Sequence, residues 1–185
     1  MLVQYKIMSC GPLIAKAMKV MFFFVGISSA YSGMADLSEL AKRTEIDASI
    51  PDHADNGKKP WTSLETLDSD NRFHFAIVTD RTGGERLNVF GPAMETVNLL
   101  QPSFVVSVGD LIEGYTKDRT QLKKEWDELD SFVGRLDAPF FYTAGNHDYS
   151  NQVMADIWRE RYGTSYYSFL YKNVLFVVLN SGLFD

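Results

Sequence analysis

The feature that most constrains the fold is a regular alternation of strand and helix patterns, which begins at Phe73. Short apolar and β-branched runs, each bounded by Gly, Asp or Pro, occupy residues 73–79, 104–108 and 140–143. Such runs are typical of strands that are covered on both faces. Apolar residues at spacings of three and four lie in residues 90–100, 122–136 and 154–161. This order predicts βαβ units with right-handed crossovers, and therefore an α/β fold with a parallel sheet.

Two more strands are expected after the last helix, which should end at Gly163. They cover residues 165–171 and 174–179, and Lys172 and Asn173 between them predict a hairpin turn. Residues 31–71 are polar and show no periodicity, and Pro51, Gly57 and Pro60 interrupt them. We interpret residues 31–71 as an irregular or linker segment.

The first thirty residues resemble an export signal. Lysines up to Lys19 precede an apolar run at 20–27, and Ser28 and Ala30 occupy the −3 and −1 positions of a signal-peptidase site. The run is too short to cross a bilayer comfortably, so we expect no lasting membrane anchor. The sequence predicts a signal peptide at residues 1–30 and a secreted or periplasmic protein. A buried N-terminal strand or helix is the alternative.

Charge and motif content exclude several classes of function. The chain has 24 acidic and 18 basic residues and a net charge of −6. An acidic chain of this kind shows no nucleic-acid-binding signature, because that affinity depends on Lys and Arg neutralising phosphates. Cys10 is the single cysteine, which excludes an internal disulfide and a cysteine-rich zinc site. Neither Gly-x-Gly-x-x-Gly nor Gly-x-x-x-x-Gly-Lys is present, which disfavours a nucleotide-binding protein.

Polar residues follow the three expected parallel strands at the point where each ends. They are Asp80, Gly109-Asp110 and Gly145-Asn146-His147-Asp148. The ligand site of such a sheet lies beyond the carboxyl ends of its strands, so we expect these loop tips to meet. A lone Asp after a strand usually caps a helix or forms a turn, whereas Gly-Asn-His-Asp is a more restrictive pattern. Carboxylate and amide oxygens suit hard or borderline cations, and the pattern predicts a divalent-metal site.

The region from Phe73 to Ser181 resembles the first half of the calcineurin-like metallophosphoesterase family. Gly109-Asp110 and the Gly145–Asp148 motif carry the resemblance, and the strand patterns near the end of the chain support it. It implies an αββα sandwich around a two-metal centre, present here only in part, over residues 72–185. The implied activity is hydrolysis of phosphoric monoesters or diesters by metal-activated water.

The resemblance also implies roles for individual residues. Asp80 matches a metal ligand, Asp110 the carboxylate that bridges two metals, and Asn146 the amide ligand of the second metal. His147 matches the residue that protonates the leaving oxygen or holds the phosphate, and Asp148 its orienting partner. The implied cofactors are two divalent metal ions in the complete site, drawn from Mn, Fe, Zn and Mg.

Two positions depart from the family pattern. Thr82, two positions after Asp80, stands where the family's first motif, Asp-x-His, has a histidine. A hydroxyl is a poor substitute for imidazole on a transition metal. Either the first metal takes other ligands, or Arg81 has moved into the site to hold phosphate directly. Glu113 stands where the family commonly has Asp or Asn. Its role is open among metal binding, exposure to solvent and support of the loop.

The sequence offers few side chains that could ligate two metals in a closed site. His147 is the last histidine of the sequence, and His74, within the first expected strand, is expected to bond a neighbour rather than a metal. The family's later histidine motifs have no counterpart up to Asp185. The expectation is therefore a truncated form with weak activity or none. The alternative is a non-catalytic domain of the same fold that binds an anionic ligand or partner.

Overall fold

The computed structural model describes residues 45–66, 72–84 and 87–182. The expected signal peptide at residues 1–30 lies outside these ranges. Within them, no helix combines the length and apolar character that a membrane span requires. The elements in chain order are β1 (Asp47–Ser49), the 3-10 helix η1 (Asp52–Ala54), β2 (Ala76–Val78), α2 (Phe90–Leu99), β3 (Val105–Ser107), α3 (Arg119–Val133), β4 (Phe140–Phe141), α4 (Gln152–Tyr162), β5 (Tyr167–Tyr171) and β6 (Val174–Val178).

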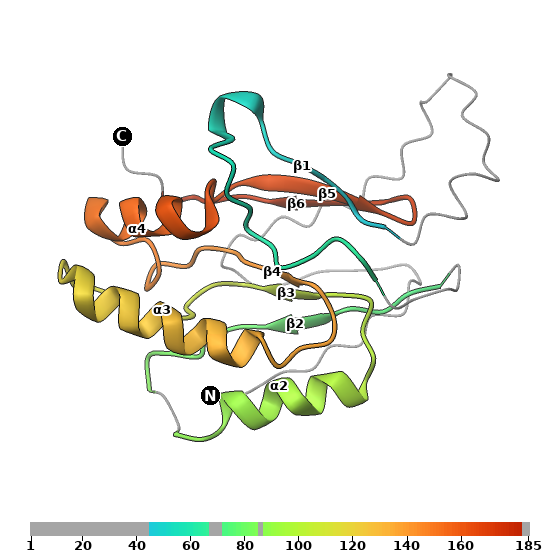
Figure 1. Ribbon diagram of the computed structural model, residues 1–185, viewed down its shortest axis with the longest axis horizontal. Helices are drawn as coiled ribbons and strands as arrows, with labels where there is room; N and C mark the ends of the chain where they lie inside the picture. The colour runs from blue at the N-terminus through green and yellow to red at the C-terminus, as the bar shows by residue number, and fades with distance from the viewer. Residues whose placement is uncertain (1–44, 67–71, 85–86, 183–185) are drawn as a thin grey trace.

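Two sheets form adjacent layers. The first is parallel, in the order β2-β3-β4, and the second is antiparallel, in the order β1-β5-β6. Figure 1 shows α2 and α3 on the side of the parallel sheet that faces away from the second sheet. The βαβ order and the parallel sheet predicted from the sequence are confirmed. Three layers of the expected αββα sandwich, one of helices and two of sheet, are present in the described residues.

Each face of the parallel sheet buries its own apolar core. Between the two sheets, Phe104 packs edge-on against Phe169, Tyr171 and Phe176, at ring-centroid distances of 5.2–5.5 Å. Beneath the helices, Trp126 of α3 and Trp158 of α4 meet at 5.6 Å, and both are fully buried. The parallel strands are covered on both faces, and this explains why their sequence reads as continuous apolar runs.

Helix boundaries follow local capping chemistry. The Asp118 side chain accepts hydrogen bonds from the Thr120 and Gln121 amides at the start of α3. Asn151 does the same for the first turn of α4. Helix α4 ends at Gly163, as expected, and the φ of 78° at this glycine is a conformation that glycine adopts without steric cost.

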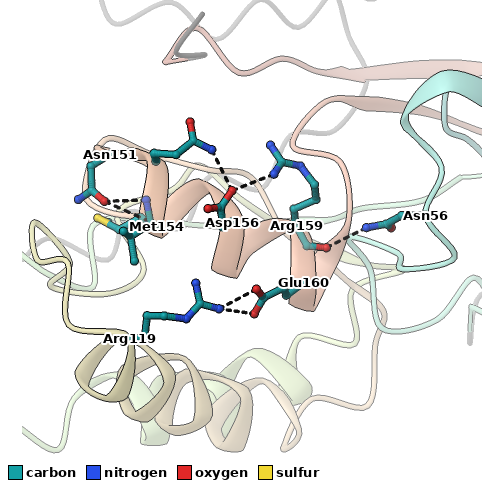
Figure 2. A network of polar contacts seen from close by, with 9 residues as sticks. Asn56, Arg119, Asn151, Met154, Asp156, Arg159 and Glu160 are labelled. Atoms are coloured by element: carbon teal, nitrogen blue, oxygen red, sulfur yellow. Dashed lines mark hydrogen bonds and ion pairs between the residues drawn. The ribbon is translucent and has the colours of Figure 1, made fainter.

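Helix α4 begins at Gln152, shortly after the Gly145–Asp148 loop. Figure 2 shows the polar contacts on its exposed side. Arg119 of α3 reaches both carboxylate oxygens of Glu160 at 2.6 Å. The Asn56 side chain donates to the Arg159 carbonyl at 3.0 Å, which ties the N-terminal segment to the same helix.

The structure gives residues 45–66 more order than the irregular segment expected from the sequence. Strand β1 pairs antiparallel with β5, and Trp61 forms a bridge to Phe141. The Trp61 ring also lies 5.5 Å from Tyr167. Two of the three β1 residues are exposed, and so short a strand leaves almost no alternation in the sequence. Residues 45–66 therefore pack as part of the domain.

The β5–β6 hairpin is confirmed with the turn that the sequence predicted. Lys172 and Asn173 both have positive φ, 45° and 66°, and Tyr171 pairs with Val174. Two consecutive left-handed residues are typical of the tight turns that match strand twist. The strands of the parallel sheet are shorter than expected, although backbone hydrogen bonds from Ser103 to His74 and from Ala76 to Phe104 extend the contact between β2 and β3 toward Phe73.

Candidate active site

The loops that follow β2, β3 and β4 meet at one edge of the parallel sheet. The Asp80 amide donates to the Gly109 carbonyl at 3.3 Å, which joins the first loop to the second. The His147 amide donates to Asp110 Oδ1 at 3.1 Å, which joins the third loop to the second. These bonds bring together the three loop tips that the sequence placed at strand ends.

Two glycines permit this approach. A Cβ at Gly145 would lie 2.4 Å from both the Asp110 amide nitrogen and Asp110 Oδ1. A Cβ at Gly109 would lie 2.4 Å from the Gly145 amide nitrogen, and Gly109 also has a φ of 89°. Any side chain at either position would separate the loops, so both glycines are needed for steric reasons.

Asp148 is the structural link between the second and third loops. Its carboxylate is fully buried and accepts from the Leu111 and Ile112 amides at 2.8 and 3.1 Å, and from the Gly145 amide at 2.8 Å. Burial raises the pKa of Asp148 to about 6, against the opposing effect of the three amide donors. The structure therefore does not place Asp148 as the orienting partner of His147, the role expected from the family resemblance.

The backbone of Glu113 orients His147 instead. His147 Nδ1 lies 2.8 Å from the Glu113 carbonyl oxygen, which can only accept, so Nδ1 carries the proton. Nε2 points toward the first loop, where a Cβ on Gly83 would lie 3.8 Å from it. Nε2 is thus the ring nitrogen that can exchange a proton at the site.

The other two histidines lie elsewhere. His74 Nε2 is 2.7 Å from the Leu100 carbonyl, in agreement with its expected bond to a neighbour, and His53 lies 3.1 Å from the Tyr166 hydroxyl.

Arg81 does not reach into the site, contrary to the alternative in which it holds phosphate. Its side chain is buried, donates to the Leu111 carbonyl at 3.1 Å and forms an ion pair with Glu128 of α3. The guanidinium also lies over the rings of Phe90 and Phe132, at 5.9 and 5.3 Å. The two aromatic rings and the Glu128 carboxylate lie together, and they hold the Arg81 guanidinium among them, away from the edge of the sheet where the loops meet.

Thr82 and Glu113 both support the loops. The Thr82 hydroxyl donates to the Asp110 carbonyl at 3.1 Å, parallel to the bond from its own amide. The exposed Glu113 carboxylate accepts from the Gly83 amide at 3.5 Å. Of the three alternatives for Glu113, the structure therefore shows solvent exposure with loop support.

Tyr115 is a site residue that the sequence reasoning missed. Its hydroxyl accepts a hydrogen bond from Asn146 Nδ2, and its ring lies 4.5 Å from the His147 ring in an edge-to-face arrangement. The chain reaches this position through Gly114, where a Cβ would lie only 1.8 Å from the His147 carbonyl oxygen. The one signal in the sequence was an aromatic residue that follows Gly114 in the loop, five positions after Asp110.

The donor atoms suit a cation at this edge. Asp80 and Asp110 offer carboxylates, and Asn146 offers an amide oxygen, because its nitrogen is bonded to Tyr115. Oxygen donors of this kind fit one hard divalent cation, and water or substrate would complete its coordination. Across residues 45–66, 72–84 and 87–182, no group of three or more His, Cys, Asp or Glu side chains could hold a metal. The set formed by Asp80, Asp110 and Asn146 has only two side chains of these four types, so it does not qualify as such a group.

Comparison with known proteins now decides the family. The model of the calcineurin-like phosphoesterases matches residues 73–183, which is more than half of the chain and includes all three loops. The chain belongs to the calcineurin-like phosphoesterase family. The family assignment and the partial αββα sandwich expected from the sequence are both confirmed. Members of this family are phosphoester hydrolases that generally use divalent metals.

The curated relatives are phosphatases. The chain is 29% identical over 160 residues to the mouse (Mus musculus) serine/threonine-protein phosphatase CPPED1, a match that covers 80% of the chain and 51% of the relative. It is 31% identical over 163 residues to the rat (Rattus norvegicus) protein of the same name, with 81% and 52% covered. The chain thus spans about half the length of these relatives. No solved structure matches it.

Proposed function

We propose that this calcineurin-like phosphoesterase hydrolyses phosphoric esters with metal-activated water. The observation that carries the proposal is the convergence of Asp80, Asp110, Asn146 and His147 on one edge of the parallel sheet, through the hydrogen bonds that join their loops. Family membership and the named activity of the relatives support it.

The roles of the residues follow from their atoms. Asp80, Asp110 and the Asn146 amide oxygen would hold a divalent cation, which would activate water and offset the negative charge on the phosphoryl oxygens. His147 Nε2, with Nδ1 held by the Glu113 carbonyl, would protonate the departing oxygen. Asp148 and Thr82 would keep the loops in register. Mn, Fe, Zn and Mg are the cations to compare.

The relatives' names suggest the first natural substrate to test. Because they are serine/threonine-protein phosphatases, we propose a phosphoserine or phosphothreonine side chain as the ester. A phosphomonoester on an exposed peptide reaches an edge site more easily than a buried group does. The competing substrate class is a phosphodiester.

Hydrolysis of p-nitrophenyl phosphate, its bis ester and a phosphothreonine peptide, with Mn, Fe, Zn or Mg added in turn, tests the proposal. We expect His147→Ala to lower kcat by about 10²–10⁴-fold, the usual contribution of a general acid. His53→Ala is the matched control, because His53 contacts Tyr166 rather than the site loops, and its rate should equal wild type. Equal rates for wild type and His147→Ala would remove the catalytic role of His147. No turnover by wild type with any of the four metals would contradict the hydrolase proposal.

A second candidate is a non-catalytic domain that binds an anion. The observation that favours it is Thr82, whose hydroxyl is bonded to the Asp110 backbone where the family pattern has a metal-binding histidine. Binding of inorganic phosphate in the presence of Mn²⁺, together with no hydrolysis of any of the three esters, would support this candidate.

We also propose that residues 1–30 direct export. The basis is the lysine, apolar and small-residue pattern at the N-terminus. N-terminal sequencing of the protein recovered from the periplasm or medium would show a new terminus at Tyr31 if cleavage follows Ala30. Recovery of the intact N-terminus from the cytoplasm would refute the proposal.

A further inference from the structure

Tyr115 lies in an unusual position for an aromatic residue. The residue is 59% exposed, and its backbone has a φ of 49°. Bulky residues rarely adopt positive φ, and such conformations cost about 1–3 kcal/mol where the surroundings enforce them. Asp80 and Asp110 share this feature, with φ of 51° and 55°. Three strained residues therefore surround the site, and Tyr115 is the one that the proposed chemistry leaves without a role.

The Tyr115 side chain connects two residues of the site. The hydroxyl accepts from the Asn146 side-chain nitrogen, and the ring packs edge-to-face on His147. Both partners lie more than thirty positions further along the sequence. Contact with the tip of the third loop, rather than with apolar neighbours, explains why so large a side chain remains on the surface.

In the structure, the nitrogen of the Asn146 carboxamide faces the Tyr115 hydroxyl, and the carboxamide oxygen therefore faces away from Tyr115. An amide nitrogen carries two hydrogens and cannot ligate a cation, whereas the oxygen can. The terminal torsion of asparagine is broad and roughly two-fold, so an unrestrained carboxamide would populate both orientations. A partner that accepts a hydrogen bond from the nitrogen leaves the oxygen for a metal.

We propose that Tyr115 is a positioning residue that orients the Asn146 carboxamide, so that its oxygen is presented to a divalent cation, and that holds the His147 ring. This inference rests on the proposed function in assuming that a divalent cation binds at Asn146 and, for its His147 part, that the chain hydrolyses a phosphoric ester. In this role Tyr115 would not ligate the cation itself and would act through its two neighbours, Asn146 and His147.

Manganese binding to the whole chain, measured by isothermal titration calorimetry, tests the hydroxyl. Tyr115→Phe keeps the ring and removes the hydroxyl, and we expect Mn²⁺ to bind about 10–100-fold more weakly, as is usual when a residue that orients a ligand is lost. Tyr166→Phe is the matched control, because it removes a hydroxyl that bonds His53 instead, and its affinity should equal wild type.

A double-mutant cycle separates orientation from general disturbance. Asn146→Asp replaces the carboxamide by a carboxylate with two equivalent oxygens, so orientation ceases to matter. In that background, Tyr115→Phe should change the Mn²⁺ affinity by less than about threefold, which is near the usual error for independent sites. An equal loss in both backgrounds would overturn the positioning role.

Two further measurements keep the outcome decisive. The NMR signal of the Asn146 side-chain amide should shift in Tyr115→Phe and remain in place in Tyr166→Phe. Tyr115→Leu, which also removes the ring, should bind Mn²⁺ as Tyr115→Phe does but show a kcat lower by roughly tenfold, because His147 loses its support. Equal kcat values for the two variants would remove the His147 part of the proposal.

The results also distinguish this inference from the proposed function. Wild-type binding of Mn²⁺ without hydrolysis would sink the hydrolase proposal and the His147 part of the inference, and it would leave the orientation of Asn146 by Tyr115 intact. Wild-type affinity in Tyr115→Phe would overturn the positioning role and leave the hydrolase proposal intact. Absence of Mn²⁺ binding by wild type would overturn the inference.

Discussion

Gly145→Ala is the substitution that most directly tests how the three loops form the site. The new Cβ would lie 2.4 Å from the Asp110 amide nitrogen and from Asp110 Oδ1, whereas ordinary contact begins at 3.4 Å. The third loop must therefore move about 1 Å away from Asp110, and the obstacle is largely backbone, which cannot rotate aside. Overpacking of this kind costs about 3 kcal/mol of unfolding free energy. For a chain of this length that corresponds to a fall in Tm of about 10 °C.

The same displacement separates Asp110 from Asn146. A misplacement of about 1 Å in a catalytic arrangement costs roughly 100-fold, and we expect Mn²⁺-dependent hydrolysis of p-nitrophenyl phosphate to fall by that factor. Mn²⁺ affinity, measured by calorimetry, should fall together with it. These two measurements distinguish a displaced site from a protein that is merely less stable.

Gly57→Ala is the matched control for this substitution. Gly57 has a φ of 81° and no heavy atom within 4 Å of the new Cβ, so alanine introduces backbone strain without a clash. That strain costs about 1–2 kcal/mol, and neither Mn²⁺ affinity nor hydrolysis should change. A Gly145→Ala protein with the same affinity and activity as Gly57→Ala would refute the steric argument.

Two further predictions concern the core. Arg81→Ala should lower the unfolding free energy by about 2–3 kcal/mol in urea titration, because the Leu111 carbonyl and Glu128 lose a charged donor. The KM for p-nitrophenyl phosphate should stay unchanged. A raised KM at unchanged stability would instead show that Arg81 contacts the substrate. Burial raises the pKa of Tyr167 well above the usual tyrosine value, so its stabilising contribution is complete below about pH 10 and is lost as pH rises further. Tyr167→Phe should reduce the slope of alkaline destabilisation by about 1.4 kcal/mol per pH unit, and an unchanged slope would show that Tyr167 ionises in the folded state.

The sequence alone determined the fold class and the location of the site. Buried parallel strands leave short, continuous apolar runs, and the helices between them leave a period near 3.6, so the βαβ order could be read from Phe73 onward. Parallel strands present their carboxyl ends at the same edge, which placed Asp80, Asp110 and the Gly145–Asp148 motif together before any contact was known. The hairpin turn at Lys172 and Asn173 could also be predicted from the sequence, because the conformation of a tight turn depends on its own residues.

Only the tertiary structure decided which way the side chains point and what they bond. Arg81 follows Asp80 directly, yet it turns into the helical core because Glu128 and two aromatic rings lie there. Asp148 follows His147 directly, yet its carboxylate bonds the amides of Leu111 and Ile112 in the second loop.

Partners this far apart in sequence meet only when the sheet has formed, and no local pattern encodes them. Tyr115 escaped detection for the same reason, since its role depends on the third loop, more than thirty residues away. Strand periodicity and turn chemistry act over a few residues and can be read from the chain. The choice of hydrogen-bond partner at the site is a property of the packed loops.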